Sequence, residues 1–439
     1  MRHAIVVGSG AGGALAARQL QRDFAVTVLE AGNEFRPLRA DPRRLAQFRR
    51  TGLFRDERMI RLLFPAMRVT LTSEHMALVR GMATGGTTTL ATGNALRCDE
   101  GLRELGIDLD SEFAALSREL PISTAHQKRW RPVTRTLFET CGRLNLAPEV
   151  MPKLVDNQRC TRCGRCVLGC PTGAKWDSRR HLREAVAAGA RLVTGARVES
   201  ILGFRQGAAG RATGVVAHMH GRRRFLPADL VVLAAGGLGT PAILERSRIP
   251  TQPRLFVDPV LCVSAPYPDA HLDREVPMPF VAQRDGYLLS PYFDYLSFFF
   301  NRTWRLPAPG IITLMVKLMD TETGSVTAAG RRGRVDICKA LTRRDRDRFV
   351  EATSLCRDIL AECGVNPSAA FLGTLNAGHP GGTVPLTGRE RHELHPDALP
   401  DNVYVADASL LPVSLGRPPM MTIMALAHRI ATVCRDRLA

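Results

Sequence analysis

Residues 1–32 read MRHAIVVGSGAGGALAARQLQRDFAVTVLEAG, and this stretch decides the fold. The apolar run at 4–7 predicts a buried parallel strand, which passes directly into the glycine-rich sequence GSGAGG at 8–13. A helix-forming segment follows, and a second β-branched run ends at Glu30. This order is the complete fingerprint of a dinucleotide-binding βαβ unit: a strand, G-x-G-x-x-G, a helix, a second strand and an acid about 20 residues further on. A glycine-rich structural turn is the alternative, but it does not require this whole context.

Each glycine of the fingerprint has its own physical role. Gly8 permits the tight turn, Gly10 lets the backbone approach a pyrophosphate, and Gly13 lets the helix lie close to the strand. The N-terminus of that helix presents free N–H groups and positive dipole to the phosphates. Glu30 would accept hydrogen bonds from an adenosine ribose and would repel a 2′-phosphate.

The length and the net charge of the chain limit which class of protein it can be. A chain of 439 residues can hold two or three domains of ordinary size. Its net charge of +18 comes mainly from arginine, which is densest at 36–61. Such a charge can attract nucleic acid, anionic lipid or an acidic protein, but no recognition helix or RNA-binding motif accompanies it. We therefore expect a solvated basic surface, no nucleic-acid partner, and a partly helical excursion over the nucleotide site at 36–61.

The sequence also indicates where the protein is found. No signal peptide precedes the fingerprint strand, and no apolar run approaches the roughly 18 residues that span a bilayer. The longest apolar patches, at 292–300 and 311–319, are interrupted by Asp294, Ser297 and Lys317. We expect a cytoplasmic protein without a transmembrane segment, with peripheral membrane attachment left open, in which thiols stay reduced.

Four of the eleven cysteines crowd into the sequence CTRCGRCVLGCP at 160–171. The spacing C-x2-C-x2-C-x3-C-P is that of bacterial ferredoxin-type [4Fe–4S] ligation. The candidate ligands are Cys160, Cys163, Cys166 and Cys170. In two-cluster ferredoxins the fourth cysteine serves the other cluster, so Cys98 and Cys141 remain alternatives for the fourth ligand. Zinc, which usually takes two separated ligand pairs, metal-free thiols and a disulfide are the other interpretations.

Three later segments are expected to complete the nucleotide-binding domain that the first strand begins. RGMATGGTTTLATGN at 80–94 disfavours a packed helix and suits a backbone that lies against a ligand, although a plain surface loop is the alternative. DLVVLAAGGLGTP at 229–241 predicts a second buried strand that meets a glycine-rich turn and a helix. NVYVADAS at 402–409 predicts a strand that ends in an acid. Together they predict one sheet assembled from distant segments around a single nucleotide.

The remaining sequence completes an α/β protein with an α+β substrate domain. Residues 255–395 carry alternating and aromatic runs, interrupted by a charged helix at 344–363, and this pattern predicts an antiparallel sheet facing the first domain. The expected parts are a discontinuous Rossmann-like domain at 1–100, 190–254 and 396–439, a helical insertion with the cysteine run at 101–189, and a substrate-binding domain at 255–395.

Five motifs in this order resemble the glucose–methanol–choline (GMC) family of FAD-dependent oxidoreductases. They are GSGAGG with Glu30, GGTTTLATGN, AAGGLGTPAIL, HPGGT, and NVYVADASLLPVS followed by PPMMTIMALAHRIA. The resemblance covers nearly the whole chain. It implies a Rossmann-like FAD-binding domain and oxidation of a CH–OH group in an alcohol, sugar or sterol-like substrate, with proton abstraction and hydride transfer to flavin N5.

The resemblance also implies roles for individual residues. His379 resembles the active-site histidine beside flavin N5, and a neutral imidazole can accept the hydroxyl proton. Considered alone, this residue could equally be a loop histidine bound to backbone. Asn376 is the second catalytic candidate. The candidate FAD-binding residues are Gly8, Gly10, Gly13, Glu30, Gly85, Gly86, Thr87, Asn94, Val198, Gly236, Asp407, Pro419 and Met420.

Two positions depart from the family pattern. The second catalytic residue, usually Asn or His, aligns with Pro418, and proline can neither donate a hydrogen bond nor abstract a proton. Either His379 works alone, or Asn376 or Asn94 supplies the polar group, or the reaction is not ordinary alcohol oxidation. Leu90 stands where some relatives attach flavin covalently through histidine, so we expect dissociable FAD.

The cysteine run is found in a subset of similar proteins, and it changes the expected electron acceptor. A cluster near the flavin would pass electrons singly to a ferredoxin, cytochrome or quinone-linked carrier, which favours a dehydrogenase over an oxidase. Reduction or desaturation of a C–C bond and non-catalytic electron transfer are the alternative functions. The apolar run at 292–300 is compatible with a bulky hydrophobic substrate or with core packing.

Overall fold

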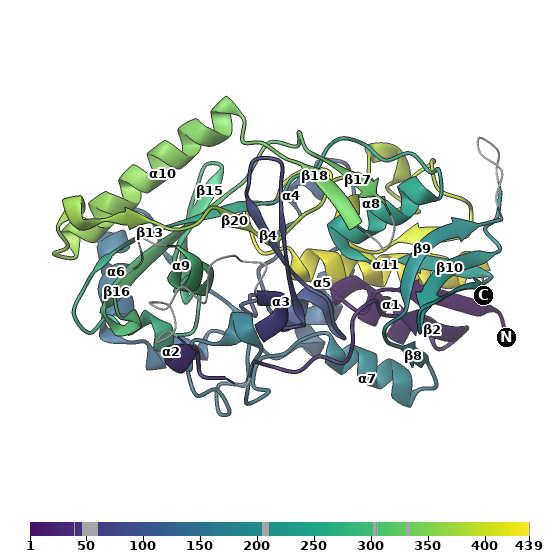
Figure 1. The fold of residues 1–439 in the computed structure, drawn as a ribbon, viewed down its shortest axis with the longest axis horizontal. Coiled ribbons are helices and arrows are strands. Elements are labelled where there is room, and N and C mark those ends of the chain that lie inside the picture. The colour runs from purple at the N-terminus through teal and green to yellow at the C-terminus, as the bar shows by residue number, and fades with distance from the viewer. Residues whose placement is uncertain are drawn as a thin grey trace.

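A five-stranded parallel sheet lies at one end of the molecule, where Figure 1 labels β2 and β8, and its order is β21-β12-β1-β2-β8. The computed structural model describes residues 1–38, 40–45, 60–203, 210–301, 304, 306–330 and 334–438. The strands of this sheet are β1 (His3–Val7), β2 (Ala25–Leu29), β8 (Arg191–Val193), β12 (Leu230–Leu233) and β21 (Val403–Val405). All four pairings are parallel, which confirms the predicted α/β class and its assembly from distant segments.

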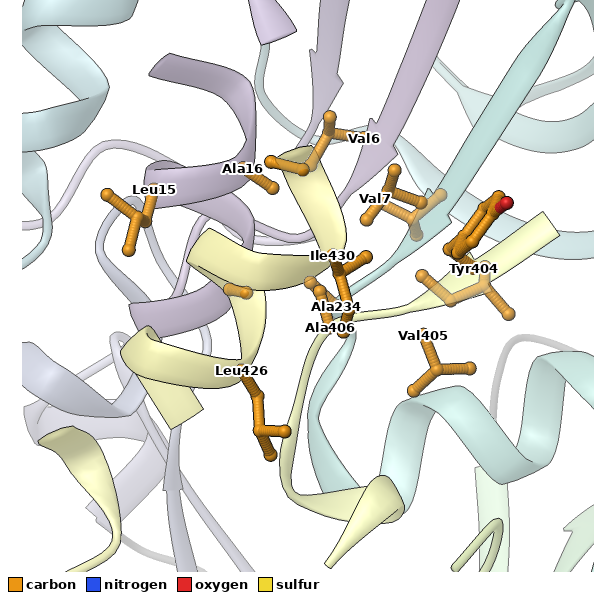
Figure 2. Close-up of a cluster of buried hydrophobic side chains, with 14 of the residues drawn as sticks. Val6, Val7, Leu15, Ala16, Ala234, Tyr404, Val405, Ala406, Leu426 and Ile430 are labelled. Carbon is orange, nitrogen blue, oxygen red and sulfur yellow. The ribbon is translucent and has the colours of Figure 1, made fainter. Parts of the chain in front are cut away.

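Two helices pack beside this sheet, one with a buried face of mostly small side chains and one with a mixed apolar face. α1 (Ala11–Leu20) buries Ala14, Ala16 and Ala17, and α11 (Met420–Leu438) buries a mixed face of Leu, Ile, Ala and Met. Figure 2 shows side chains of β1, α1, β21 and α11 meeting in one buried cluster, among them Val6, Leu15, Val405, Leu426 and Ile430. Each large aliphatic side chain buried there stabilises the fold by about 1.5–3 kcal/mol.

A second, nine-stranded sheet lies at the other end of the molecule. Its order is β3-β4-β20-β13-β16-β15-β14-β6, with β19 paired to β13. The strands are β3 (Met67–Leu71), β4 (Ala77–Gly81), β6 (Glu149–Val150), β13 (Pro259–Pro266), β14 (Phe280–Arg284), β15 (Tyr287–Pro291), β16 (Ile311–Leu318), β19 (Phe371–Leu372) and β20 (Asn376–Ala377). The sheet is mainly antiparallel, as predicted, but β4 and β20 pair in parallel. The long helix α10 (Arg343–Glu362) contacts β13, β15 and β16 of this sheet, and it begins at a capping box formed by Thr342 and Asp345 (Figure 1).

The other elements connect these two sheets. The helices are α2 (Pro42–Leu45), α3 (Ile60–Leu63), α4 (Glu100–Arg103), α5 (Asp110–Glu119), α6 (Pro132–Arg143), α7 (Arg179–Ala187), α8 (Gly236–Arg246) and α9 (Tyr295–Phe300). The strands are β5 (Ile122–Ser123), β7 (Lys153–Leu154), β9 (Arg197–Leu202), β10 (Gly214–Met219), β11 (Arg222–Pro227), β17 (Ser325–Ala329) and β18 (Arg334–Cys338). Among the described residues, no helix is long and apolar enough to cross a membrane.

Two parts of the structure differ from the sequence interpretation. The aromatic run continues as α9 rather than as strand, because the Asp294 side chain accepts hydrogen bonds from the backbone N–H groups of Leu296 and Ser297 and caps a helix. The hairpin β3–β4, which we assigned to the nucleotide-binding domain, pairs with the second sheet through β20. Most of the 36–61 stretch lies outside the described residues, and its described flanks contain the short helices α2 and α3.

Candidate functional site

A cavity of about 460 Å³ lies between the two sheets. Residues at or just beyond the carboxyl ends of β1, β2, β12 and β21 line one side, where open parallel sheets bind their ligands. Residues of β13, β16 and β20 line the other side. Most of the candidate residues meet here: Gly8, Gly10, Glu30, Gly86, Thr87, Asn94, Val198, Gly236, Asn376, His379, Asp407, Pro419 and Met420. Gly13 and Gly85 do not line the cavity.

The fingerprint glycines perform two different tasks. An added Cβ at Gly8 would lie 2.3 Å from the carbonyl oxygen of Ala234, and one at Gly13 would lie 2.1 Å from that of Gly8. These two glycines therefore allow strand, turn and helix to pack closely. An added Cβ at Gly10 would meet no atom within 4 Å, although Gly10 lines the cavity. Gly10 thus leaves space for a ligand rather than for protein.

Glu30 holds the phosphate-side loops in place. Its Oε2 accepts hydrogen bonds from the backbone N–H of Ser9 at 3.1 Å and from Ser9 Oγ at 2.6 Å, and its Oε1 accepts from Gly32 N–H at 2.8 Å. Burial raises the pKa of this carboxyl group, while these hydrogen bonds oppose the rise. The carboxylate lines the cavity but also organises its own surroundings.

The segment 85–89 lies against the fingerprint loop. Gly85 N–H donates to Ser9 Oγ at 3.1 Å, and an added Cβ at Gly86 would lie 2.9 Å from Gly10 Cα. Ser178, just before α7, donates to the Gly85 carbonyl at 3.0 Å and also contacts the hydroxyl of Thr88 at 2.9 Å. Both glycines have positive φ, so this close approach depends on glycine.

The C-terminal segment completes the nucleotide side of the cavity. Asp407 Oδ2 accepts hydrogen bonds from Gly236 N–H at 2.8 Å and from Thr240 Oγ1 at 2.5 Å, which ties β21 to the start of α8. An added Cβ at Gly237 would lie 1.9 Å from the carbonyl oxygen of Pro380, the residue that follows His379. The start of α8 is therefore packed directly on the loop that carries the candidate base.

His379 lines the cavity with a side chain that is 28% exposed. Its Nδ1 lies 3.2 Å from Asp258 Oδ2, and the same carboxylate oxygen lies 2.5 Å from Lys317 Nζ. Burial lowers the pKa of His379, Lys317 lowers it further, and Asp258 opposes both effects. Burial disfavours the ionised form of Asp258, but Lys317 and His379 lower the pKa of this carboxyl group to about 2. The imidazole is therefore held neutral near pH 7.

The four cysteines of the run line a second, small pocket. Neither Cys98 nor Cys141 lines it. Four thiolates on one tetrahedral zinc ion stand about 3.8 Å apart, given Zn–S bonds of about 2.3 Å. Among the described residues, no three cysteines bring their sulfur atoms within 4.8 Å of one another. As they stand, no three of the described cysteines are therefore close enough to share one zinc ion.

Lys175 joins this pocket to the larger cavity. It is buried, and its Nζ donates to the carbonyl oxygens of Thr88, Thr89, Ala91 and Cys166 at 2.7–3.2 Å. Its backbone N–H contacts Cys170 Sγ at 3.4 Å. Leu168, between these cysteines, lines the larger cavity. One buried lysine therefore fixes the cysteine loop against the segment 85–91.

The family model for GMC oxidoreductases matches residues 3–261, which is more than half of the chain. The chain belongs to the GMC oxidoreductase family. It is 35% identical over 271 residues to uncharacterized GMC-type oxidoreductases of Mycobacterium tuberculosis, a match that covers 57% of this chain and 40% of the mycobacterial proteins. The chain thus spans less than half the length of these relatives.

Other similarities cover almost the whole GMC chain. An uncharacterized protein of Methanocaldococcus jannaschii is 22% identical over 428 residues, which is 97% of each chain. A long-chain-alcohol oxidase of Arabidopsis thaliana is 24% identical over 99% of this chain and 67% of its own length. The crystal structure of pyridoxine 4-oxidase from Mesorbium loti superposes with a TM-score of 0.73 at 18% identity, covering 98% of this chain and 99% of that one. The last comparison confirms the fold.

The residues present fit FAD, the cofactor that membership of the GMC family implies. The start of α1, the free space beside Gly10 and the glycine-rich segment 85–89 converge on one cavity that extends to His379. Leu90 contributes an apolar side chain to the cavity wall, which offers no nucleophile for covalent attachment.

We expect Gly10→Ala to weaken FAD binding by about tenfold or more without unfolding the protein. The backbone at Gly10 has φ −70°, which alanine accepts, and the new methyl group would enter the ligand space. Gly12→Ala is the matched contrast, because its Cβ would lie 1.7 Å from the carbonyl oxygen of Ala406 and should destabilise the fold itself. Flavin titration and melting of the FAD-free proteins measure the two effects. Equal losses of melting temperature in both variants would contradict this division of roles.

Sequence reasoning missed several residues of this GMC site. Asp258, Lys175 and Ser178 received no role, and Lys317 was noted only as an interruption of an apolar run. The usable signal was that Lys317 stands alone among apolar residues of a strand, since a lysine in such a place must find a partner when it is buried.

Proposed function

We propose that this protein is an FAD-dependent dehydrogenase that oxidises a CH–OH group and passes the electrons singly through a [4Fe–4S] cluster. The observation that carries the first half is the position of His379, a neutral imidazole in the cavity that the fingerprint loop also lines. The names of two similar proteins, a long-chain-alcohol oxidase and a pyridoxine 4-oxidase, describe oxidation of alcohols and support the same type of reaction.

The chemistry at His379 follows from its hydrogen bonding. When bound, FAD accepts the hydride from the carbon that bears the hydroxyl group. A neutral His379 that donates its Nδ1–H to Asp258 has a free lone pair on Nε2, and this atom takes the hydroxyl proton. Asn376 and Asn94 line the same cavity and are the candidates for orienting the hydroxyl in place of Pro418. The substrate then leaves as the carbonyl compound. The hydride has removed two electrons and one proton, and the hydroxyl proton has gone to His379.

The cavity wall favours an apolar substrate. α9 contributes Tyr295, Leu296, Phe299 and Phe300, and Phe64 and Met67 line the cavity as well. Burying a hydrocarbon chain against such a surface is favourable by about 0.8 kcal/mol per CH₂ group. We therefore infer a hydrophobic alcohol as the substrate class.

The geometry of the cysteine pocket supports a cluster with Cys160, Cys163, Cys166 and Cys170 as ligands. All four line one pocket, and their C-x2-C-x2-C-x3-C-P spacing in the sequence is that of ferredoxin-type ligation. Lys175 fixes this loop beside the FAD cavity, so a cluster there could take electrons from reduced flavin. Such a route favours a one-electron carrier over oxygen as the acceptor.

Several arginines lie in or next to the cysteine run, one of them, Arg162, in the wall of the cysteine pocket, and they suggest the nature of that carrier. Arg159, Arg162 and Arg165 lie within the cysteine run or next to it. Two further arginines lie close to the run: the Arg162 side chain donates to the carbonyl oxygen of Arg129, and Gly164 packs on the backbone of Asp273 and Arg274. In the described part of the chain, none of these guanidinium groups pairs with a carboxylate. We infer an acidic electron-carrier protein such as a ferredoxin as the acceptor.

Anaerobic titration with alcohols tests the reaction. We expect primary alcohols of increasing chain length to bleach the oxidised flavin absorbance of the purified protein with rising affinity, and a one-electron acceptor to restore it. If no alcohol reduces the flavin while reduced ferredoxin and an activated C=C substrate together turn over, the enzyme reduces C–C bonds instead, and the alcohol assignment is wrong.

A further inference from the structure

The acceptor of the His379 Nδ1–H, Asp258, belongs to a larger charged cluster in the cavity. Asp258 is buried, and each of its carboxylate oxygens has defined partners. Oδ2 lies 2.5 Å from Lys317 Nζ and 3.2 Å from His379 Nδ1, and Oδ1 accepts hydrogen bonds from Ser414 Oγ at 2.5 Å and Gly416 N–H at 3.3 Å. The partners come from three distant segments, which carry Lys317, His379 and the pair Ser414 and Gly416, and the fold brings them to one carboxylate.

The backbone also holds Asp258 in place. It has φ +51°, an uncommon conformation for a residue other than glycine, and its backbone N–H donates to Asp320 Oδ1 at 2.8 Å. Asp320 in turn is paired with the buried Lys339 at 2.7 Å. A strained and fully buried carboxylate that contacts a cavity histidine is a feature typical of functional sites.

We propose that the Lys317–Asp258 ion pair positions His379 for catalysis, with Asp258 fixing the Nδ1–H tautomer and Lys317 holding Asp258 in its charged, oriented form. This inference rests on the proposed function, because it assigns to His379 the role of base. Asp258 and Lys317 are positioning residues in this scheme, since they act through the imidazole. Asp258 and Lys317 orient His379, and this compensates for the absence of a polar residue at the position of Pro418.

The two partners act on the imidazole in opposite directions. The negative charge of Asp258 favours the imidazolium form, and the positive charge of Lys317 disfavours it. The other titratable groups near the cluster are Asp320, which is paired with Lys339, and Cys98, whose thiol pKa burial raises to about 12. Neither Cys98 nor the Asp320–Lys339 pair makes a described hydrogen bond to His379.

Single substitutions should therefore shift the pH dependence in opposite directions. In K317M the pKa of His379 should rise, so flavin reduction by alcohol, which needs the neutral imidazole, should begin at higher pH. In D258N the pKa of His379 should fall, so the rate of flavin reduction should begin to rise at lower pH. The maximal rate should nevertheless drop by about 100-fold or more, because the amide no longer enforces one tautomer of His379. D258E and K317R should recover part of the wild-type rate.

A spectroscopic measurement separates this inference from the reaction itself. We would label the holoenzyme with ¹⁵N-histidine, assign His379 by its loss in H379Q, and follow its two nitrogens with pH in the absence of alcohol. We expect the Nδ1–H tautomer in the wild type and a mixture of the two tautomers in D258N. The pH midpoint of the His379 titration should shift in opposite directions in D258N and K317M. R429M, which breaks the Arg429–Glu112 pair away from the cavity, is the control and should leave the His379 tautomer unchanged.

The outcomes are distinguishable from failure of the proposed function. If alcohols reduce the flavin but His379 is Nε2–H or both variants shift its midpoint the same way, the positioning role is overturned while the dehydrogenase stands. If the tautomer and the opposite shifts are found but no alcohol reacts, the positioning role holds and the substrate assignment fails. Should K317M not fold, the charge-neutral double variant D258N/K317M replaces it, and an unchanged Nδ1–H tautomer there would overturn the proposal.

Discussion

Replacement of His379 by Gln should leave FAD bound and slow its reduction by alcohol by about 10²–10⁴-fold, the usual contribution of a general base. The imidazole lies in the cavity beside Asp258, but no contact that holds the nucleotide fingerprint together involves it. Glutamine keeps much of the volume and polarity of the side chain, so the loop that continues to Gly381 should keep its packing. Stopped-flow reduction under anaerobic conditions, together with the flavin content of the purified variant, measures the effect.

The control for this experiment is His392→Gln, which changes an exposed histidine in a surface turn. Its reduction rate should match that of the wild type. If H379Q reduces its flavin at the wild-type rate with the same alcohol, His379 is not the base, and the non-catalytic electron-transfer function becomes the better explanation of the cavity.

Cys163→Ser should remove nearly all iron and acid-labile sulfide from the anaerobically purified protein while leaving the flavin in place. Cys163 lines the small pocket, whereas the FAD cavity is built from other residues. Reduction of the flavin by alcohol should therefore persist, but its reoxidation by an acidic ferredoxin should be lost. Because that encounter is expected to be electrostatic, the wild-type rate should also fall steeply with added salt.

Cys338→Ser is the matched control, since Cys338 is an exposed thiol on β18 far along the chain from the run. It should keep its full iron content. Comparison of Cys170→Ser with Cys98→Ser identifies the fourth ligand, and we expect only the former to lose the cluster. A wild-type protein that contains no iron when it is prepared without oxygen would disprove the cluster and return the pocket to metal-free thiols.

The sequence predicted the nucleotide side of the molecule well because its signals are local. Strand, glycine turn and helix follow one another within residues 1–32, and β12 is followed almost directly by α8. β21 and α11 likewise follow one another along the chain. The cysteine spacing is local too, and the structure brings all four thiols to one pocket. The choice of ligand, substrate and acceptor still depends on the experiments above.

The substrate side was harder to predict because its determinants are distant in sequence. Asp258 meets Lys317 and His379 only when β13 and β16 pair and the loop after β20 folds over them. α9 was misread as strand because aromatic residues favour sheets, and a single capping aspartate outweighed that preference. Each of these outcomes was decided by tertiary contacts that no window of sequence contains.

The parallel pairing of β4 with β20 has a mechanical consequence. β4 leads within a few residues to the cavity-lining segment that begins at Gly86, and β20 leads to His379. Asn376 pairs with Ala77 and Ala377 with Leu78, so one strand ladder joins these two parts of the cavity wall. If FAD and the substrate bind as proposed, the spacing between His379 and the cofactor would be set by the main-chain hydrogen bonds that pair β4 with β20.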